Sequence, residues 1–250
     1  MSSAVPALTV PPADLVKHLA KQPDQSLVEL IAPYRKYEAY LRETFAQDRD
    51  SELLKDPYVN ALPLFTEDTP NIKIRARDLE NESDEEKSRY IMSLPDDIRR
   101  PHGSAAVVSD LKEFRRNFNV FSESALVELD WSNVVAAGSS VVNCLLPVPE
   151  QYSGTKRGLR EFYHEKFCPA SDVDLFLYGL TEEQAIEKIK DIETRVRDVL
   201  LVETTTVRTK HAVTICRFLL PPSPDVLLLK TATGSQHPNR HIQVGCFGTR

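Results

Sequence analysis

The sequence predicts an α+β fold in which helices back a mixed sheet, preceded by a helical amino-terminal region. Two stretches predict strands: an apolar run over 134–137 that ends in glycine and serine, and an alternating run over 173–178. A strongly periodic helical stretch follows the second run and leads into residues 204–216, which are rich in threonine and valine. Strand, helix and strand in this order are typical of a sheet covered by helices.

The 250 residues are expected to form two parts. Residues 1–105 are the predicted helical and loop-rich region, because apolar side chains recur at helical spacing over 13–19 and 26–54 and prolines interrupt the segment that follows. Residues 106–250 are the predicted core. Within it, residues 217–234 are atypical, and we expect this segment and the last residues to come from non-coding or frame-shifted sequence, leaving a truncated core.

The most strongly predicted helix starts after Thr181. The run Thr181-Glu182-Glu183-Gln184 has the spacing of a capping box, in which the first and fourth residues satisfy each other's backbone N–H groups. The apolar residues behind it recur every three or four positions, as a helix with one buried face requires. They are Ala185, Ile186, Ile189, Ile192, Val196, Val199 and Leu200.

Composition narrows the class of protein. Hydrophobic residues make up 41% and charged residues 27%, which is ordinary for a globular chain. The formal net charge of −6 argues against non-specific nucleic-acid binding, which needs a basic surface. The sequence shows neither a signal-peptide pattern nor a long apolar run, so we expect no membrane association. Four cysteines without paired spacing predict an intracellular, cytoplasmic protein rather than a disulfide framework.

Two fragments carry the candidate chemistry. The turn Gly138-Ser139-Ser140 follows a predicted strand, and its small residues leave backbone N–H groups open to a phosphate. Asp172 and Asp174 lie two apart in an extended run, so both side chains are expected on one face. Two neighbouring carboxylates repel unless a cation lies between them, and Mg²⁺ prefers such oxygen ligands. A solvated strand edge is the alternative interpretation.

At these residues the chain resembles the polymerase-β-like nucleotidyltransferase superfamily. More closely, residues 114–214 resemble the amino-terminal nucleotidyltransferase-like region of fungal ankyrin-repeat proteins, notably in the phrases 130–139 and 170–180. The resemblance implies a nucleotidyltransferase-like fold, a nucleoside triphosphate held at Gly138 and Ser139, and Mg²⁺ held by Asp172 and Asp174. It also implies transfer of a nucleotidyl group to an acceptor that the sequence does not identify.

The chain departs from the superfamily pattern in two ways. Asp172 follows Gly138 by 34 residues, much farther than is usual, so an inserted loop or helical excursion is expected between them. Gln243 stands where the resemblance implies a third carboxylate, and an amide brings no charge to a metal. The second hypothesis is therefore a catalytically inactive interaction module with protein partners. The inserted cations either close over a triphosphate or are solvated: Lys156, Arg157, Arg160 and Lys166.

Overall fold

A computed structural model describes residues 5–23, 25–56, 58–76, 80–89, 99–169, 171–200, 204–209, 212–217 and 241–246, with 86, 89, 217 and 241–246 described by backbone alone. The chain divides into two compact units, residues 1–111 and 112–250, and each is described by itself. The predicted α+β class is confirmed. Apart from residue 217, the segment expected to be atypical lies outside the described residues. None of the helices described is long and apolar enough to cross a membrane.

The first unit is built mainly from helices. A small core of Leu15, Leu30 and Tyr34 joins α1 to α2, and Leu8 and Val10 pack against it from the preceding segment. The Tyr34 hydroxyl donates a hydrogen bond to the Val10 carbonyl, which fixes that segment to α2. The elements are η1 (Pro12–Asp14), α1 (Leu15–Lys21), α2 (Leu27–Gln47), η2 (Glu52–Leu54), η3 (Thr69–Asn71) and α3 (Asp84–Arg89).

Helix α2 is shorter than the periodic stretch predicted over 26–54. Ser26 begins the helix by accepting a hydrogen bond from the Glu29 N–H, as expected for an N-cap serine. At the other end, Asp48 adopts φ −146° and ψ 86°, which is incompatible with helix, and a separate 3₁₀ turn follows at Glu52–Leu54. The apolar residues keep their helical spacing across this break, so the sequence pattern could not show where α2 ends.

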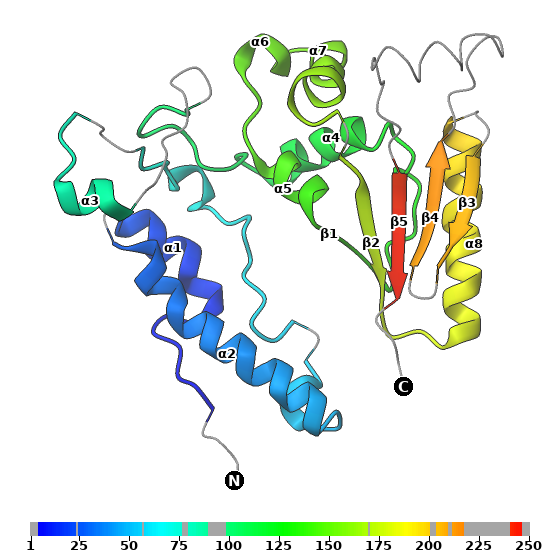
Figure 1. The fold of residues 1–250 in the computed structure, drawn as a ribbon, viewed down its shortest axis with the longest axis horizontal. Helices are drawn as coiled ribbons and strands as arrows, with labels where there is room; N and C mark the ends of the chain where they lie inside the picture. Colours follow the sequence, from blue (N-terminus) through cyan, green and yellow to red (C-terminus); the bar gives the residue numbers. More distant parts are fainter. Residues whose placement is uncertain are drawn as a thin grey trace. The chain divides into compact units, whose positions relative to one another are not determined.

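The second unit contains one five-stranded sheet (Figure 1). The strand order is β1-β2-β5-β4-β3, with β2 and β5 parallel and every other neighbouring pair antiparallel. The stretch 204–216, predicted as strand-like, forms two antiparallel strands rather than one. The strands are β1 (Val134–Ala137), β2 (Val173–Leu177), β3 (Thr204–Arg208), β4 (Ala212–Arg217) and β5 (His241–Cys246).

The two faces of this sheet differ. Along β2, Val173, Leu175 and Leu177 are buried, whereas Asp174 and Phe176 between them are only partly buried. The buried residues belong to a core that also contains Ile215 of β4 and residues of helices α4 (Leu111–Phe121), α5 (Ser139–Leu145) and α8 (Glu182–Leu200). Strand alternation therefore directs the two aspartates away from the main core.

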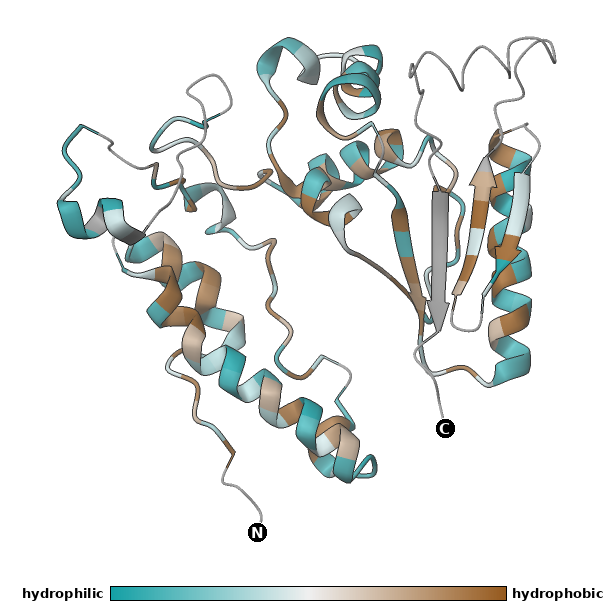
Figure 2. Cartoon of the chain, in the orientation of Figure 1, coloured by the Kyte–Doolittle hydropathy of each residue, from teal (hydrophilic) through white to brown (hydrophobic). Residues whose placement is uncertain are grey.

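Helix α8 begins as the sequence predicts. The Thr181 hydroxyl accepts a hydrogen bond from the Gln184 N–H, and the Gln184 side chain accepts one from the Thr181 N–H, which completes a capping box. Apolar and polar residues alternate along α8 where it runs beside β3 and β4 (Figures 1 and 2). Ile192 is fully buried, but Ile186 and Val199, predicted on the same apolar face, are 37% and 39% exposed.

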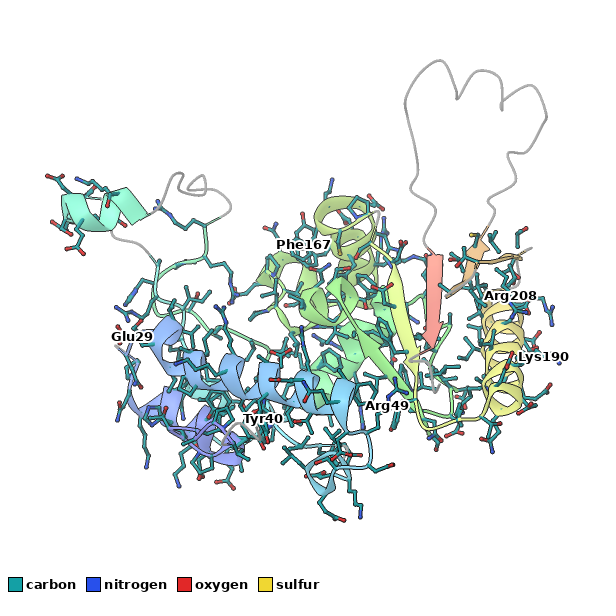
Figure 3. All side chains as sticks on the ribbon, turned by 60° about the horizontal axis from the view of Figure 1, so that its bottom comes forward. Glu29, Tyr40, Arg49, Phe167, Lys190 and Arg208 are labelled. Atoms are coloured by element: carbon teal, nitrogen blue, oxygen red, sulfur yellow. The ribbon has the colours of Figure 1, made fainter. Side chains whose placement is uncertain are left out.

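The long connection between β1 and β2 is helical, as expected for an excursion. It contains α5, α6 (Glu150–Ser153), α7 (Lys156–Glu161) and the π-helical turn η4 (Phe162–Phe167). Tyr163 is buried in the main core and contacts Phe121 edge to face, which attaches the excursion to α4. Phe167 stacks on Phe162 at the end of the excursion and is partly exposed there (Figure 3). The excursion thus returns the chain to β2 through packed helical turns.

Replacing Ile192 by alanine should destabilise the second unit by about 2–5 kcal/mol, because its fully buried side chain would leave a cavity between α8 and the sheet. Ile186→Ala is the matched control on the same helix. Because Ile186 is partly exposed, its loss should cost about 0.5–1 kcal/mol at most. Urea unfolding of both variants measures the difference, and equal losses would contradict the assignment of the buried face of α8.

Candidate functional site

The candidate site begins at the turn between β1 and α5. Gly138 has φ 78° and ψ −156°, a conformation that is essentially restricted to glycine. This residue reverses the chain so that β1 ends and α5 begins within one residue. Because a side chain would be strained here, the local backbone explains why the sequence has glycine at position 138.

A carboxylate lies directly against this turn. A Cβ atom placed on Gly138 would come within 2.6 Å of the Asp174 Oδ2 atom. The strand register accounts for this proximity, since Ala137 at the end of β1 is paired with Asp174 of β2. Asp174 therefore lies beside the glycine turn, although Asp172 comes 34 positions after Gly138 in the sequence.

Serines hold the two fragments together. The Ser139 and Ser171 hydroxyl oxygens are 2.9 Å apart, so the first residue of α5 is hydrogen-bonded to the segment just before Asp172. Ser140 is fully buried, and its hydroxyl donates to the Ala137 carbonyl at 3.3 Å. The Ser140 side chain therefore shapes the turn from inside, whereas Ser139 lies at its exposed surface. A ligand could therefore contact Ser140 only through its backbone.

Asp172 and Asp174 affect each other electrostatically. Both side chains are partly buried, in alternation with the buried Val173. Desolvation, and secondly the negative charge of Asp172, raise the pKa of Asp174 above its ordinary value. This coupling agrees with the strand alternation, which sets the two carboxylates on one face. A divalent cation bound there would offset both the repulsion and the desolvation.

The described side chains provide a pair of acids and no larger ligand cage. Among them, no three His, Cys, Asp or Glu residues form a group able to hold a metal. The strand register pairs the backbone of Gln243 in β5 with that of Asp174, so the residue expected in place of a third carboxylate is the neighbour of Asp174 in the sheet. A metal at this site would therefore take two protein carboxylates and need its other ligands from a substrate or from water, as Mg²⁺ commonly does.

The cations of the helical excursion do not act together in this structure. Arg160 forms an ion pair with Glu123 at 3.4 Å, on the loop that follows α4. Lys156, Arg157 and Lys166 are exposed. A clamp over a triphosphate stays a prediction for these three lysine and arginine side chains, whereas Arg160 would first have to leave its carboxylate partner.

Two residues near the site carried no functional role in the sequence analysis. Ser171 precedes Asp172 and meets Ser139, and its position in Ser-Asp-Val-Asp was a local signal for it. Cys216 of β4 is far from the aspartates in sequence, yet burial and the charge of Asp172 raise the pKa of its thiol. That relation follows from the pairing of β5 with both β4 and β2, because no local motif connects residues 172 and 216.

The assignment of this site depends on its own side chains. Comparisons of the chain with protein-family models, with curated proteins and with solved structures find no match. The contact between Gly138 and Asp174 and the coupling of Asp174 to Asp172 are the observations that bear on function.

Gly138→Ala should destabilise the second unit by about 1–3 kcal/mol, since alanine is strained at this φ and ψ and its Cβ would displace the Asp174 carboxylate. Gly154→Ala is the control, because Gly154 has φ −72° and an added Cβ there meets nothing within 4 Å. Its effect should not exceed about 1 kcal/mol and should be stabilising if present. Urea denaturation checks both, and an unaffected Gly138→Ala protein would refute the close approach.

Asp174→Asn should stabilise the metal-free protein at neutral pH by up to about 1 kcal/mol, a small effect because the Asp174 side chain is only partly buried and solvent screens its charge. The pKa of Asp174 is higher in the folded chain than in the unfolded chain. At a pH between these two pKa values, the folded chain keeps the Asp174 proton and the unfolded chain releases it. Wild-type stability therefore falls as pH rises through that window. The asparagine of the variant has no carboxyl group to titrate, so the variant lacks this pH dependence.

The measurement is urea unfolding with chelator between about pH 3 and pH 7, for wild type and Asp174→Asn, with the exposed Asp198→Asn as a charge-matched control. The stabilisation by Asp174→Asn should disappear at acid pH. A stabilisation that stays constant over the whole range would show that Asp174 is not electrostatically destabilised.

Proposed function

We propose that the second unit binds a nucleoside triphosphate together with Mg²⁺, with the phosphates at Gly138 and Ser139 and the metal at Asp172 and Asp174. The observation that carries this proposal is the contact of the Asp174 carboxylate with the Gly138 turn. It brings an open glycine-serine backbone and a pair of acids to one place on the sheet. This combination is what the resemblance to the polymerase-β-like nucleotidyltransferases implies.

The two carboxylates fit a magnesium ion chemically. Asp172 and Asp174 are oxygen donors that share a face, and burial together with the charge of Asp172 raises the pKa of Asp174, a shift that a bound cation would offset. Mg²⁺ is usually held by one or two carboxylates and by substrate phosphates, so two acids suffice for metal-nucleotide binding. A bound Mg²⁺ supplies charge neutralisation on the phosphates.

The reaction that this arrangement serves is nucleotidyl transfer, in which an acceptor hydroxyl attacks the α-phosphorus and pyrophosphate leaves. The chain would contribute positioning: the turn at Gly138 would orient the phosphates, and the two aspartates would hold the Mg²⁺ that supplies charge neutralisation. The hydroxyl of Ser139 is exposed, near the phosphates in this arrangement, and is already oriented by Ser171. The acceptor class is left open between a nucleic-acid end, a small molecule and a protein side chain.

A second candidate function is nucleotide binding without turnover, in an interaction module with protein partners related to the ankyrin-repeat proteins. The observation that favours it is Gln243 at the register position beside Asp174. A neutral amide there leaves the metal cage with one negative charge fewer than a full set of three carboxylates. Binding and catalysis are therefore separable properties of this site.

Asp174→Asn should weaken Mg²⁺-dependent nucleotide binding by about tenfold or more, because it removes one of two anionic metal ligands. Isothermal titration calorimetry with ATP, GTP, CTP and UTP, each with Mg²⁺ and with EDTA, measures this effect. Asp198→Asn removes an equal charge from an exposed position of α8 and should leave binding unchanged. Equal affinity of wild type and Asp174→Asn for every nucleotide would refute the site.

Pyrophosphate release under the same conditions then separates the two functions. Release that depends on Asp174 identifies the enzyme, whereas tight binding without release identifies the inactive module. Because the acceptor is not identified, the assay includes a single-stranded oligonucleotide, a polyol and the protein itself as acceptors.

A further inference from the structure

One edge of the five-stranded sheet ends in an exposed strand. β3 is the last strand in the order β1-β2-β5-β4-β3, so within the described part of the chain no strand lies on its outer side. Residues 205–208 of β3 are exposed, including Val207 at 48%. Natural sheets usually protect such an edge with lysine, proline or a bulge. β3 has none of these, because it reads Thr-Thr-Thr-Val-Arg and pairs with β4 one residue to one along its length.

The hairpin register shows which backbone groups of β3 face outward. The Thr209 N–H donates to the Ala212 carbonyl at 2.8 Å, so residues 209 and 212 form a hydrogen-bonded pair. Hydrogen-bonded and non-hydrogen-bonded pairs alternate along an antiparallel ladder. Residues 205 and 207 therefore bond to β4, whereas the N–H and C=O groups of Thr206 point away from β4, toward the outer edge. Another strand could pair with these outward groups.

Helix α8 continues this edge on one face of the sheet. Glu193 accepts a hydrogen bond from the Thr206 hydroxyl at 2.8 Å, so the flank of α8 that carries Glu193 faces β3. The opposite flank faces the other way, since Lys188 and Arg195 bond to the segment 128–130. Residues spaced by four, three and four positions form one stripe along the flank that faces β3. They are Ile186, Lys190, Glu193 and Arg197.

The charges of this stripe match those of a second copy of itself. A two-fold axis through the middle of the stripe would place Lys190 opposite Glu193 of the second copy, and Ile186 opposite the aliphatic part of Arg197. Ile186 is 37% exposed, so it has apolar surface left to bury there. Lys190 pairs with Glu187 at 2.8 Å, but both side chains are mostly exposed, so this pair is weak and can be exchanged.

We propose that this edge is a two-fold interface with a second copy of the chain, in which β3 pairs antiparallel with its counterpart and the two α8 helices pack side by side. Both contacts are compatible. α8 lies beside β3 and β4 (Figure 1), so a two-fold axis at the outer side of β3 is about 5 Å from the axis of α8. The two helices would then be about 10 Å apart, as packed helices are. Lys190 and Arg208 both lie at this side of the unit (Figure 3).

The candidate nucleotide site is not part of this interface. β1, which leads into the Gly138 turn, is at the opposite end of the strand order from β3. The two-fold interface and the proposed nucleotide binding are therefore independent of one another, and the interface is tested without nucleotide.

Sedimentation of the full chain between about 1 μM and about 1 mM should show a dimer that forms with rising concentration. Lys190→Glu and Glu193→Lys should each weaken the dimer at least about tenfold, because each change creates two like-charged contacts across the axis. The double variant Lys190→Glu/Glu193→Lys should return to within about threefold of the wild-type affinity, since opposite charges face each other again. Asp198→Lys has the same change in net charge as Glu193→Lys at an exposed position outside the stripe, and should leave the dimer unchanged.

A second measurement needs no variant. Hydrogen exchange, resolved to single amides by mass spectrometry with electron-transfer fragmentation, should show the Thr206 amide at least about tenfold slower in the dimer than in the dilute monomer. The Val207 amide, which already bonds to β4, should change less. A chain that stays monomeric up to about 1 mM, a dimer that survives both single charge reversals, a double variant that stays monomeric, or a Thr206 amide that exchanges equally in dimer and monomer would each overturn the proposal.

Discussion

The contact between the backbone of Gly138 and the carboxylate of Asp174 is the constraint on which the second unit's site depends. It requires a glycine, because any side chain at position 138 would occupy the space of Asp174 Oδ2. It also requires the observed pairing of β1 with β2, which sets Ala137 beside Asp174. A shift by one residue in this pairing would turn the aspartates into the core. The observed strand register therefore requires glycine at position 138, and the absence of a side chain there makes this register possible.

The site carries a local energetic cost that is consistent with a binding role. Asp174 is partly desolvated beside a second acid, so its ionised form is disfavoured in the folded chain. An acid that served only solubility would instead be expected at an exposed position or paired with a cation. Asp130 in the same unit shows the contrast, because its carboxylate is exposed and pairs with Lys188 at 2.9 Å. Groups whose charge is left uncompensated in a folded protein are candidates for ligand contact.

Features that depend on residues close together in the sequence could be predicted from local sequence patterns. The capping box at Thr181, the apolar strand over 134–137 and the common face of Asp172 and Asp174 all follow from spacing within a few residues. Prediction failed where tertiary contacts decide. The break after Gln47 interrupts a continuous apolar period, and Ile186 fits the periodic face yet is substantially exposed to solvent. The proximity of Cys216 to Asp172 depends on strand pairing between segments far apart in the chain, which no local pattern encodes.

The position of β5 in the sheet has a consequence for how the second unit folds. β5 is the last of the five strands along the chain, yet it lies at the centre, between β2 and β4. Before it docks, β1 with β2 and β3 with β4 can form only as separate two-stranded ribbons, which are marginally stable alone. Closing the parallel β2–β5 pair spans a long loop, so this step carries most of the entropic barrier. Because the two ribbons are marginal alone, the sheet is expected to become stable only when β5 joins them, so the pairing beside the aspartates and the sheet as a whole form together.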